Sequence, residues 1–529
     1  MNEPINSSDH DHDHQGGFAC HCCPDGRRQQ GTGFSRRGFF AAAAAGGAVL
    51  GGLSWSSLAA AGEPELPMPA GRKPLKVLPI LVWDHPQQRP MTSWRHWGGI
   101  HTPEAAAEEV ARITKELAGI AADADFPVEF GKVASVNDVK KMTDSAEVMA
   151  ADVVIVYGAG IAVDGCEKFG KDVIMFQRHR SGPVYLQYEV VSPRFLRQRT
   201  DALAFDKIAF DDVVTDSMEE LTWRLRALCG LKNTRAEKVV CIGGAGGWGQ
   251  PSGVIPELVQ KVWGLDLQTV SYDDLGRFIE EARADEKAVA LAKRRADAYL
   301  AGDGITLETK REFVDNCFLL DQVFRGLMTK AGARAITILG CMGTIMPKAQ
   351  TAACLSLSTL NDDGYLAFCE SDFVVIPSGI LLAGISGKPV FLNDPTYPHD
   401  GVITLAHCTG PRKMDGKTLQ NVRIVTHFES DYGAAPKPEW PKGQVVTNIA
   451  PDFKSERWMG LLGEVADSPF LPICRDQIDV RYDVPDQLVA ERMPGFHWMT
   501  GYGDYTKELG YALRRVGIAW DHLRPTLTV

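Results

Sequence analysis

The sequence predicts an α/β protein with two parallel-sheet domains followed by a smaller β-rich C-terminal domain, and three observations lead to this prediction. The chain has 529 residues, more than one hydrophobic core usually supports. Apolar runs typical of strands buried on both faces alternate with helical segments as far as about residue 385. Beyond that point, short strand-like runs alternate with proline- and glycine-rich turns. We therefore expect two Rossmann-like domains and a third domain that is mostly β.

The first α/β domain is expected over residues 75–235, after a proline-rich linker at 62–74. It opens on a buried strand, and a helix follows with Thr102 as N-cap and Pro103 at its first position. Apolar runs predict further strands, and an amphipathic helix closes the unit. The expected elements are strands at 75–82, 152–160 and 172–177 and helices at 103–121 and 217–231.

The second α/β domain is expected over residues 236–385 and the β-rich domain over 386–529. A strand beginning at Lys238 leads into the turn GGAGGWG (243–249). The charged segment that follows predicts one long helix with a solvated face. The expected elements are helices at 274–302 and 306–331, a strand at 335–341, and strand-like runs at 421–429 and 444–450.

The glycine-rich turn at 243–249 raises the possibility of a dinucleotide site. Its spacing is not G-x-G-x-x-G, and no acidic residue ends a second strand about 20 residues later. The only acid there, Asp266, precedes its strand. A tight turn that brings the backbone close to a polar ligand is the favoured interpretation.

The first 61 residues indicate export. An arginine pair in SRRGFF, a weakly hydrophobic alanine- and glycine-rich core, and small residues ending at Ala61 form a twin-arginine signal over 35–61. Because of this signal, the twin-arginine translocase is an expected partner, and the mature protein is expected in the periplasm or at the cell surface. The alternative interpretation of the segment is a membrane anchor. Residues 1–34 carry DHDHDH and CHCC, which could bind metal, but a leader lost on cleavage is favoured.

Composition excludes several classes of partner. The net charge of −11 argues against a polyanion such as nucleic acid, which requires a basic face. No segment after residue 61 approaches about 18 unbroken apolar residues, so the mature form is not expected to span a membrane.

Nine of the 12 cysteines follow residue 61 without a CxxC pair, which argues against a disulfide framework or a zinc ribbon. We read Cys341, Cys369 and Cys408 as small apolar fillers.

Two carboxylates, Glu370 and Asp394, each follow an apolar run. Acids in such places are costly to bury unless they are paired or bind a cation. Each has an alternative role, because Glu370 could cap a helix beginning at Ser371 and Asp394 could cap a turn with Pro395. Histidines nearby in sequence, and His497 between two aromatic residues, favour a joint site. His407 could touch substrate or support the site, or be a core histidine, and His399 is expected to be exposed.

The motif CESD, followed by the aspartate of FLND and then TYP, resembles the L-fucose isomerase family. NDDGYLAFCESD is similar to a stretch of L-arabinose isomerases, and FHWMTGYGD resembles the late segment that donates a histidine. The resemblance covers about 335–529 and implies an L-fucose isomerase-like fold with Mn²⁺, or another hard divalent cation, bound by Glu370, Asp394 and His497. It also implies that the two acids form the catalytic acid–base pair. The serine in CESD is a departure, because fucose isomerases have asparagine after the glutamate.

The resemblance further implies a sugar site and an oligomer. Trp94 and Arg95, in a loosely matching segment, and His407 and Trp498 are the expected substrate-binding residues. The alternative for the Trp94 segment is a surface turn with buried tryptophans. Family members form trimers or hexamers, and the Trp94 segment can act across a subunit boundary, as it does in family members. The expected activity is interconversion of an aldose and a ketose, with a deoxyhexose or a pentose as substrate. The alternatives are a non-catalytic carbohydrate-binding protein on the same fold and an NAD-dependent sugar oxidoreductase.

The chemistry of this reaction agrees with such a residue set. Moving a proton between C2 and C1 through an ene-diolate requires a base, an acid, and positive charge near the oxygens. Two carboxylates and an imidazole leave a hard divalent ion open positions for the two sugar oxygens. Mn²⁺ binds protein ligands more weakly than copper or zinc, which would displace it in direct competition. If the protein binds Mn²⁺ in the cytoplasm, before twin-arginine export, it avoids that competition.

Overall fold

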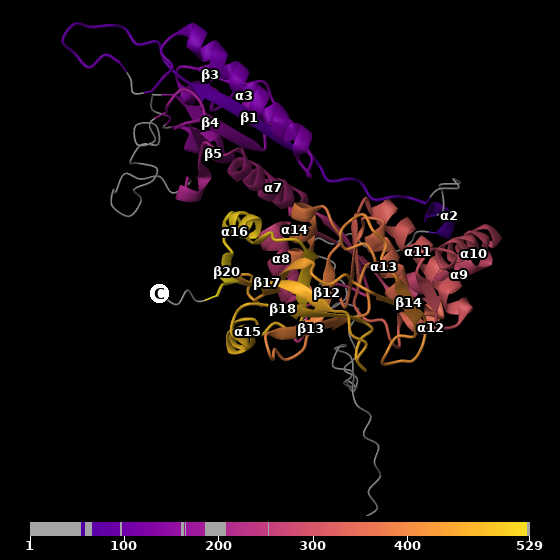
Figure 1. Cartoon of the computed structure of the whole chain (residues 1–529). Helices are drawn as coiled ribbons and strands as arrows, with labels where there is room; N and C mark the ends of the chain where they lie inside the picture. The colour runs from indigo at the N-terminus through magenta and orange to yellow at the C-terminus, as the bar shows by residue number, and fades with distance from the viewer. Residues whose placement is uncertain are drawn as a thin grey trace, which may run out of the picture.

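The computed structural model describes residues 54–58, 66–95, 98–159, 163, 165–185, 208–251 and 253–525. The His- and Cys-containing leader and the arginine pair of the export signal lie outside the described residues. Figure 1 shows two lobes, a smaller one built on the first sheet and a larger one that holds the remaining elements. None of the described helices is long and apolar enough to cross a membrane.

The smaller lobe is a parallel sheet with strand order β2-β1-β4-β5-β6, with β3 also paired to β1. Its central strands are buried on both faces, as the apolar runs predict. The strands are β1 Leu75–Val82, β2 Val128–Phe130, β3 Ala134–Val136, β4 Val153–Gly158, β5 Asp172–Gln177 and β6 Val213–Thr215. The helices beside them are α3 Pro103–Asp123 and the short α4 Ala146–Ala150.

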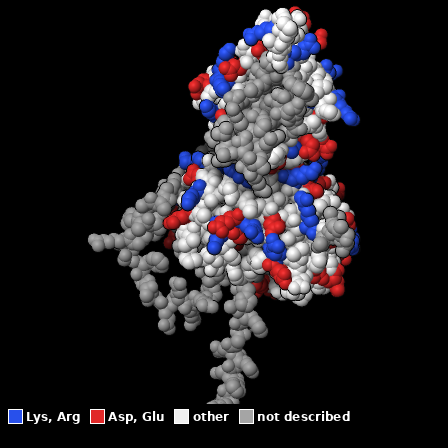
Figure 2. All heavy atoms as spheres, turned by 90° about the vertical axis from the view of Figure 1, so that its left-hand side faces the viewer, with Lys and Arg blue, Asp and Glu red and all other residues white. Residues whose placement is uncertain are grey.

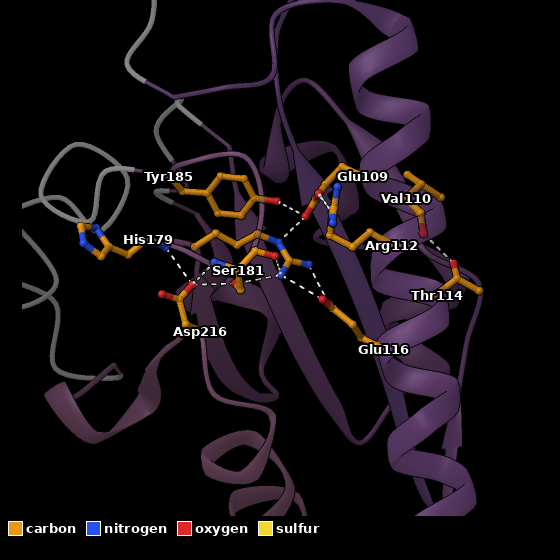
Figure 3. Close-up of polar contacts among 10 residues, drawn as sticks. Glu109, Val110, Arg112, Thr114, Glu116, His179, Ser181, Tyr185 and Asp216 are labelled. Atoms are coloured by element: carbon orange, nitrogen blue, oxygen red, sulfur yellow. Dashed lines mark hydrogen bonds and ion pairs between the residues drawn. The ribbon is translucent and has the colours of Figure 1, made fainter.

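A buried polar network ties α3 to the loop after β5 (Figure 3). The fully buried carboxylate of Glu109 accepts hydrogen bonds from the Arg178 guanidinium and the Tyr185 hydroxyl. The Arg178 guanidinium also donates hydrogen bonds to both carboxylate oxygens of Glu116, at 3.1 and 2.7 Å. Asp216 accepts three backbone N–H groups from this loop, and these bonds outweigh burial and lower its pKa to about 2. These hydrogen bonds hold the loop after β5, as far as Tyr185, against helix α3.

The second sheet is also parallel, with strand order β11-β10-β7-β8. Its strands are β7 Lys238–Ile242, β8 Asp266–Val270, β10 Ala335–Ile338 and β11 Leu366–Cys369. Its helices are α8 Val254–Trp263, α9 Tyr272–Ala284, α10 Glu286–Leu300, α11 Arg311–Ala331, α12 Ile345–Ala349, α13 Cys354–Asp362 and α14 Ile376–Ser386.

Two predicted helix boundaries in this region are wrong. The expected long helix at 274–302 is two helices, α9 and α10, which meet at Asp285. The Asp285 side chain accepts from the N–H groups of Lys287 and Ala288, and so caps the second helix. The helix expected from residue 306 begins at Arg311, because Ile305–Leu307 (β9) pairs with a strand of the C-terminal part.

The C-terminal part is an antiparallel barrel. Strands run in the order β16-β19-β12-β13-β18-β17, β16 also pairs with β17 to close the ring, and β20 is added parallel to β17. These strands are β12 Phe391–Pro395, β13 Val402–His407, β16 Val445–Pro451, β17 Arg457–Asp467, β18 Asp476–Arg481, β19 Trp498–Tyr502 and β20 Ala519–Leu523. The remaining elements are α15 Asp486–Arg492, α16 Thr506–Arg514, and β14 Val422–Val425 and β15 Ala435–Pro438, which join β9 in a small sheet. The prediction of parallel-sheet α/β domains with a β-rich C-terminal part is thus confirmed.

Helix α7 (Met218–Thr234) connects the two lobes and packs against α14 and α16. Its contact with α14 depends on two small residues. A Cβ on Gly230 would lie 2.3 Å from a side-chain carbon of Ile385, and one on Gly384 would lie 2.9 Å from the carbonyl oxygen of Gly230. The absence of these side chains lets the two helix backbones approach closely. On the face shown in Figure 2, acidic and basic side chains are interspersed over both lobes.

Candidate metal centre

Four predicted site residues meet where the carboxyl end of the second sheet faces the barrel. Glu370 directly follows β11, and Asp394 is the fourth residue of β12. His407 ends β13, and His497 immediately precedes β19. The strand ends of parallel sheets are where α/β proteins place ligand-binding groups, and the barrel here supplies the opposite wall. The sequence segments are up to 127 residues apart (370 to 497), but the fold brings them together.

The distances define a compact cluster. Nε2 of His497 lies 3.3 Å from Oε2 of Glu370 and 3.3 Å from Oδ1 of Asp394. Nε2 of His407 lies 3.7 Å from Oε1 of Glu370. Ligand atoms of Glu370, His407 and His497 all lie within 4.8 Å of one another. His407 therefore joins the three metal ligands that the family resemblance implies.

Four buried atoms of this cluster lack a hydrogen-bond partner: Oε2 of Glu370, Oδ1 of Asp394, Nε2 of His407 and Nε2 of His497. Their mutual contacts are close but do not have hydrogen-bond geometry. Leaving buried polar atoms unpaired costs about 1–3 kcal/mol each, more for charged groups. Oε2 of Glu370 and Oδ1 of Asp394 each lie 3.3 Å from Nε2 of His497, and Nε2 of His407 faces the other oxygen of Glu370. Carboxylate oxygens and imidazole nitrogens grouped in this way suit a divalent cation. The residues present therefore fit a hard divalent ion.

Backbone strain accompanies this placement of Glu370. Glu370 and Ser371 have φ angles of 68° and 45°, a left-handed conformation that residues other than glycine rarely adopt. The N–H of Ser371 donates to the Thr337 hydroxyl at 3.1 Å, and its carbonyl accepts from the N–H of Gly246 at 3.2 Å. The glycine-rich turn at 243–249 therefore supports the strained segment.

Both helix- and turn-capping alternatives for the acids are wrong. Glu370 does not begin a helix, since α14 starts only at Ile376, after the strained turn. Asp394 does not cap a turn, because it lies within β12 and pairs with Ala406 of β13. Each carboxylate instead leaves a strand end toward the cluster.

Asp372 is a site residue that sequence reasoning missed. Its Oδ2 lies 2.7 Å from Nδ1 of His497, and its Oδ1 accepts from the N–H groups of Trp248 and Val374. The contact at Nδ1 fixes the ring so that Nε2 faces Glu370 and Asp394. The signal was present in CESD, where a second acid stands two residues after Glu370.

The pKa shifts follow from burial and from the neighbouring charges. Burial raises the pKa of Glu370, and raises that of Asp394 to about 7. Burial lowers the pKa of His407 to about 3. For His497, burial disfavours the charged form, but Asp372, Glu370 and Asp394 outweigh it and raise its pKa well above the usual range. A cation would favour ionised carboxylates and neutral imidazoles, the forms that bind metal.

The carboxylates adjoin different hollows. Glu370 lines a narrow interior cavity of about 20 Å³ that several cysteines also line. Asp394 lines a hollow of about 300 Å³ that includes Tyr397, Phe496 and Trp498. The Trp498 indole N–H donates to the carbonyl of Gly495, so this ring is held in place beside the hollow. Of the two acids, Asp394 has the more exposed side chain, at 20 % against 8 % for Glu370.

The remaining candidate residues have mixed outcomes. Trp94 and Arg95 belong to the loop between β1 and α3, and that loop extends from the smaller lobe, away from the barrel (Figure 1). The Arg95 guanidinium lies over the Trp94 ring at 4.8 Å. His399 is exposed, with Nδ1 3.0 Å from the Tyr397 carbonyl. In the glycine-rich turn, Trp248 stacks on Phe496 with ring centroids 3.8 Å apart.

No protein-family model matches this sequence, and a comparison with curated proteins finds no relative. The geometry of the cluster is therefore the basis for any functional assignment.

Proposed function

We propose that this protein is a metal-dependent aldose–ketose isomerase, with Glu370, Asp394 and His497 holding a hard divalent cation such as Mn²⁺. The observation that carries the proposal is that buried carboxylate oxygens of Glu370 and Asp394, neither with a hydrogen-bond partner, each lie 3.3 Å from Nε2 of His497. When bound, the cation supplies positive charge for the oxygens at C1 and C2 of an open-chain sugar. His407 lies close enough to Glu370 to be a further ligand or to contact those oxygens.

The two carboxylates have the chemistry and placement for the proton transfers. One removes the proton from C2 and returns it to C1, while the other exchanges the proton between the two oxygens. Both sides of the reaction have the same oxidation state overall, so the step needs no external oxidant or reductant. Asp372 holds the His497 ring, and the strained turn at Glu370 fixes the direction of that carboxylate.

The hollow beside Asp394 suits a monosaccharide. Its volume of about 300 Å³ lies at the lower end of the usual range for small-molecule sites, and its aromatic wall offers surfaces for sugar stacking. We propose that the sugar binds there with C1 and C2 toward Asp394 and Glu370. Trp94 and Arg95 would then reach the sugar only from another subunit, so we propose that the active form is a homo-oligomer, a trimer or a hexamer. Export to the periplasm or cell surface remains part of the proposal.

The test is an aldose panel, including deoxyhexoses and pentoses, assayed for ketose formation with and without added Mn²⁺. We expect ketose formation that depends on Mn²⁺, with solvent deuterium incorporated at C1 of the ketose and at C2 of the recovered aldose. Glu370→Gln should abolish both, while Glu464→Gln, an exposed glutamate on β17, should leave both unchanged.

Other results would contradict the proposal in distinguishable ways. Sugar binding without isomerisation, retained in Glu370→Gln, would identify a carbohydrate-binding protein. Protection from unfolding by NADH would indicate the oxidoreductase instead.

A further inference from the structure

Five of the nine cysteines among the described residues line one interior cavity. These are Cys341, Cys354, Cys369, Cys408 and Cys474, and His427 lines the same cavity of about 20 Å³, which has room for about one water-sized particle. The sequence predicts three of them, Cys341, Cys369 and Cys408, to be small apolar fillers. Apolar packing alone does not require five thiols to line the same cavity as a histidine side chain. Thiols and an imidazole in one cavity are, however, the side chains that bind thiophilic metal ions.

The sulfur atoms are close enough to share an ion. A ligand atom from each of Cys354, Cys408 and His427 lies within 4.8 Å of the other two. The thiols of Cys354 and Cys474 are near enough to the Cys408 thiol to shift its pKa, which lies well above the usual range. In a tetrahedral zinc site, bonds of about 2.3 Å to sulfur and about 2.0 Å to nitrogen place neighbouring ligand atoms roughly 3.5–4 Å apart. Cys354, Cys408 and His427 thus lie within about 1 Å of such spacing, and Cys474 lines the same cavity as the candidate fourth ligand.

Four different elements hold these side chains in place. Cys354 begins α13, Cys408 directly follows β13, and Cys474 lies two residues before β18. His427 lies two residues after β14, and its Nδ1 is 3.0 Å from the Ser430 hydroxyl. That contact leaves Nε2 as the ring nitrogen able to bind a cation. Cys354, Cys408 and His427 are buried, whereas Cys474 is half-buried and lies on the side of the set nearer to solvent.

We propose that Cys354, Cys408, Cys474 and His427 form a second metal site, selective for a thiophilic cation such as Zn²⁺. Three thiolates and one imidazole are a common ligand set of structural zinc, and sulfur ligands disfavour Mn²⁺. The site adjoins the carboxylate cluster through His407, whose Nδ1 is 3.9 Å from Sγ of Cys408. The two ligand sets select different cations, so this proposal does not depend on the isomerase activity.

Cobalt titration of the metal-free full-length chain tests the proposal. Co²⁺ bound to thiolates gives an intense near-ultraviolet charge-transfer band and the visible bands of a tetrahedral ion. We expect both bands to saturate at one Co²⁺ per chain and to disappear when one equivalent of Zn²⁺ is added. The double substitution Cys354→Ser with Cys408→Ser should abolish them. Binding should release protons, because the buried thiols must ionise.

Three controls make the result specific. Cys166→Ser changes a buried cysteine of the smaller lobe and should leave the bands intact. Glu370→Gln should also keep them, which separates this site from the carboxylate cluster. If the double variant does not fold, His427→Ala provides the second measurement, with weakened and shifted bands. Absence of a thiolate band in the unmodified chain, or its persistence in the folded double variant, would overturn the proposal.

Discussion

The carboxylate of Asp372 lies 2.7 Å from Nδ1 of His497, and this contact aims the other ring nitrogen at Glu370 and Asp394. Asp372 is itself held by the N–H groups of Trp248 and Val374. The glycine-rich turn, the segment after β11 and the start of β19 therefore act together on one imidazole. A carboxylate behind a metal-binding histidine both orients the ring and makes it a stronger ligand.

Asp372→Asn should weaken Mn²⁺ binding about 10-fold, within the 10–100-fold range typical for such partners. The amide can keep the hydrogen-bonded geometry, but it lacks the negative charge that supports the bound imidazole. Titration followed by the electron paramagnetic resonance signal of free Mn²⁺ measures the affinity. Asp273→Asn, at a fully exposed side chain, is the matched control and should change nothing. Equal affinities for Asp372→Asn and the unmodified chain would show that Asp372 has only a structural role.

Much of the local structure could be predicted because it depends on neighbouring residues. The strand at 75–82, the strand at 172–177 and the N-cap at Thr102 are found at the predicted positions. The break at Asp285 was missed because the charged pattern continues through it, and only the capping bonds reveal two helices. The late start of α11 depends on a strand pairing with Val422–Val425, more than a hundred residues away, which helical periodicity does not report.

Only part of the site could be predicted from the sequence. Glu370, Asp394 and His497 come from a motif resemblance, and the structure places them together. The role of Asp372 depends on its distance from His497, and the thiol cluster depends on four separate segments meeting. Neither can be read from spacing along the chain. The loop that carries Trp94 and Arg95 lies in the smaller lobe, so the sugar-binding role expected of these residues stays a prediction.

Gly230→Ala should destabilise the contact between α7 and α14 by about 1–3 kcal/mol. The new methyl group would meet Ile385, including its backbone nitrogen at 2.9 Å, and backbone atoms cannot move aside cheaply. Gly119→Ala in α3 is the matched control, because nothing lies within 4 Å of its added Cβ. It should stabilise its helix by about 0.5–1 kcal/mol through helix propensity alone. Thermal unfolding of both variants measures the difference, and equal shifts would contradict the close approach of the helices.

Asp362→Asn should remove part of the pH dependence of stability. Burial raises the pKa of Asp362 to about 7, so between its unfolded pKa of 3.8 and about 7 the folded state binds a proton that the unfolded state releases. The contribution of this residue is thus most favourable below about pH 4 and declines as the pH rises to 7. At about 1.4 kcal/mol per pKa unit, the decline is at most about 4 kcal/mol. The variant should therefore be more stable than the unmodified chain at pH 8 and similar at low pH.

Urea unfolding between pH 5 and 8 checks this prediction. The asparagine oxygen can still accept from the N–H of Lys413, which Asp362 does at 2.8 Å. Asp363→Asn is the control at the neighbouring position, where the carboxylate pairs with Arg325. That variant should gain nothing at pH 8, because it loses an ion pair. A parallel pH profile for Asp362→Asn and the unmodified chain would show that Asp362 is ionised in the folded state.

Trp55 links the predicted signal segment to the body of the protein. It lies in α2 (Trp55–Leu58), its side chain is buried, and its indole N–H donates to Asp285 at 3.0 Å. Its backbone N–H donates to Glu281. In a chain that keeps these residues, Trp55→Ala should lower stability by about 3 kcal/mol, the usual loss for a buried tryptophan, and Ser56→Ala, at an exposed neighbour, should not. If export removes residues up to Ala61, the substitution has no effect on the mature protein. Mass spectrometry of the exported chain, with thermal unfolding of both variants, separates these cases, and an unaffected midpoint in an uncleaved chain would refute the docking of α2.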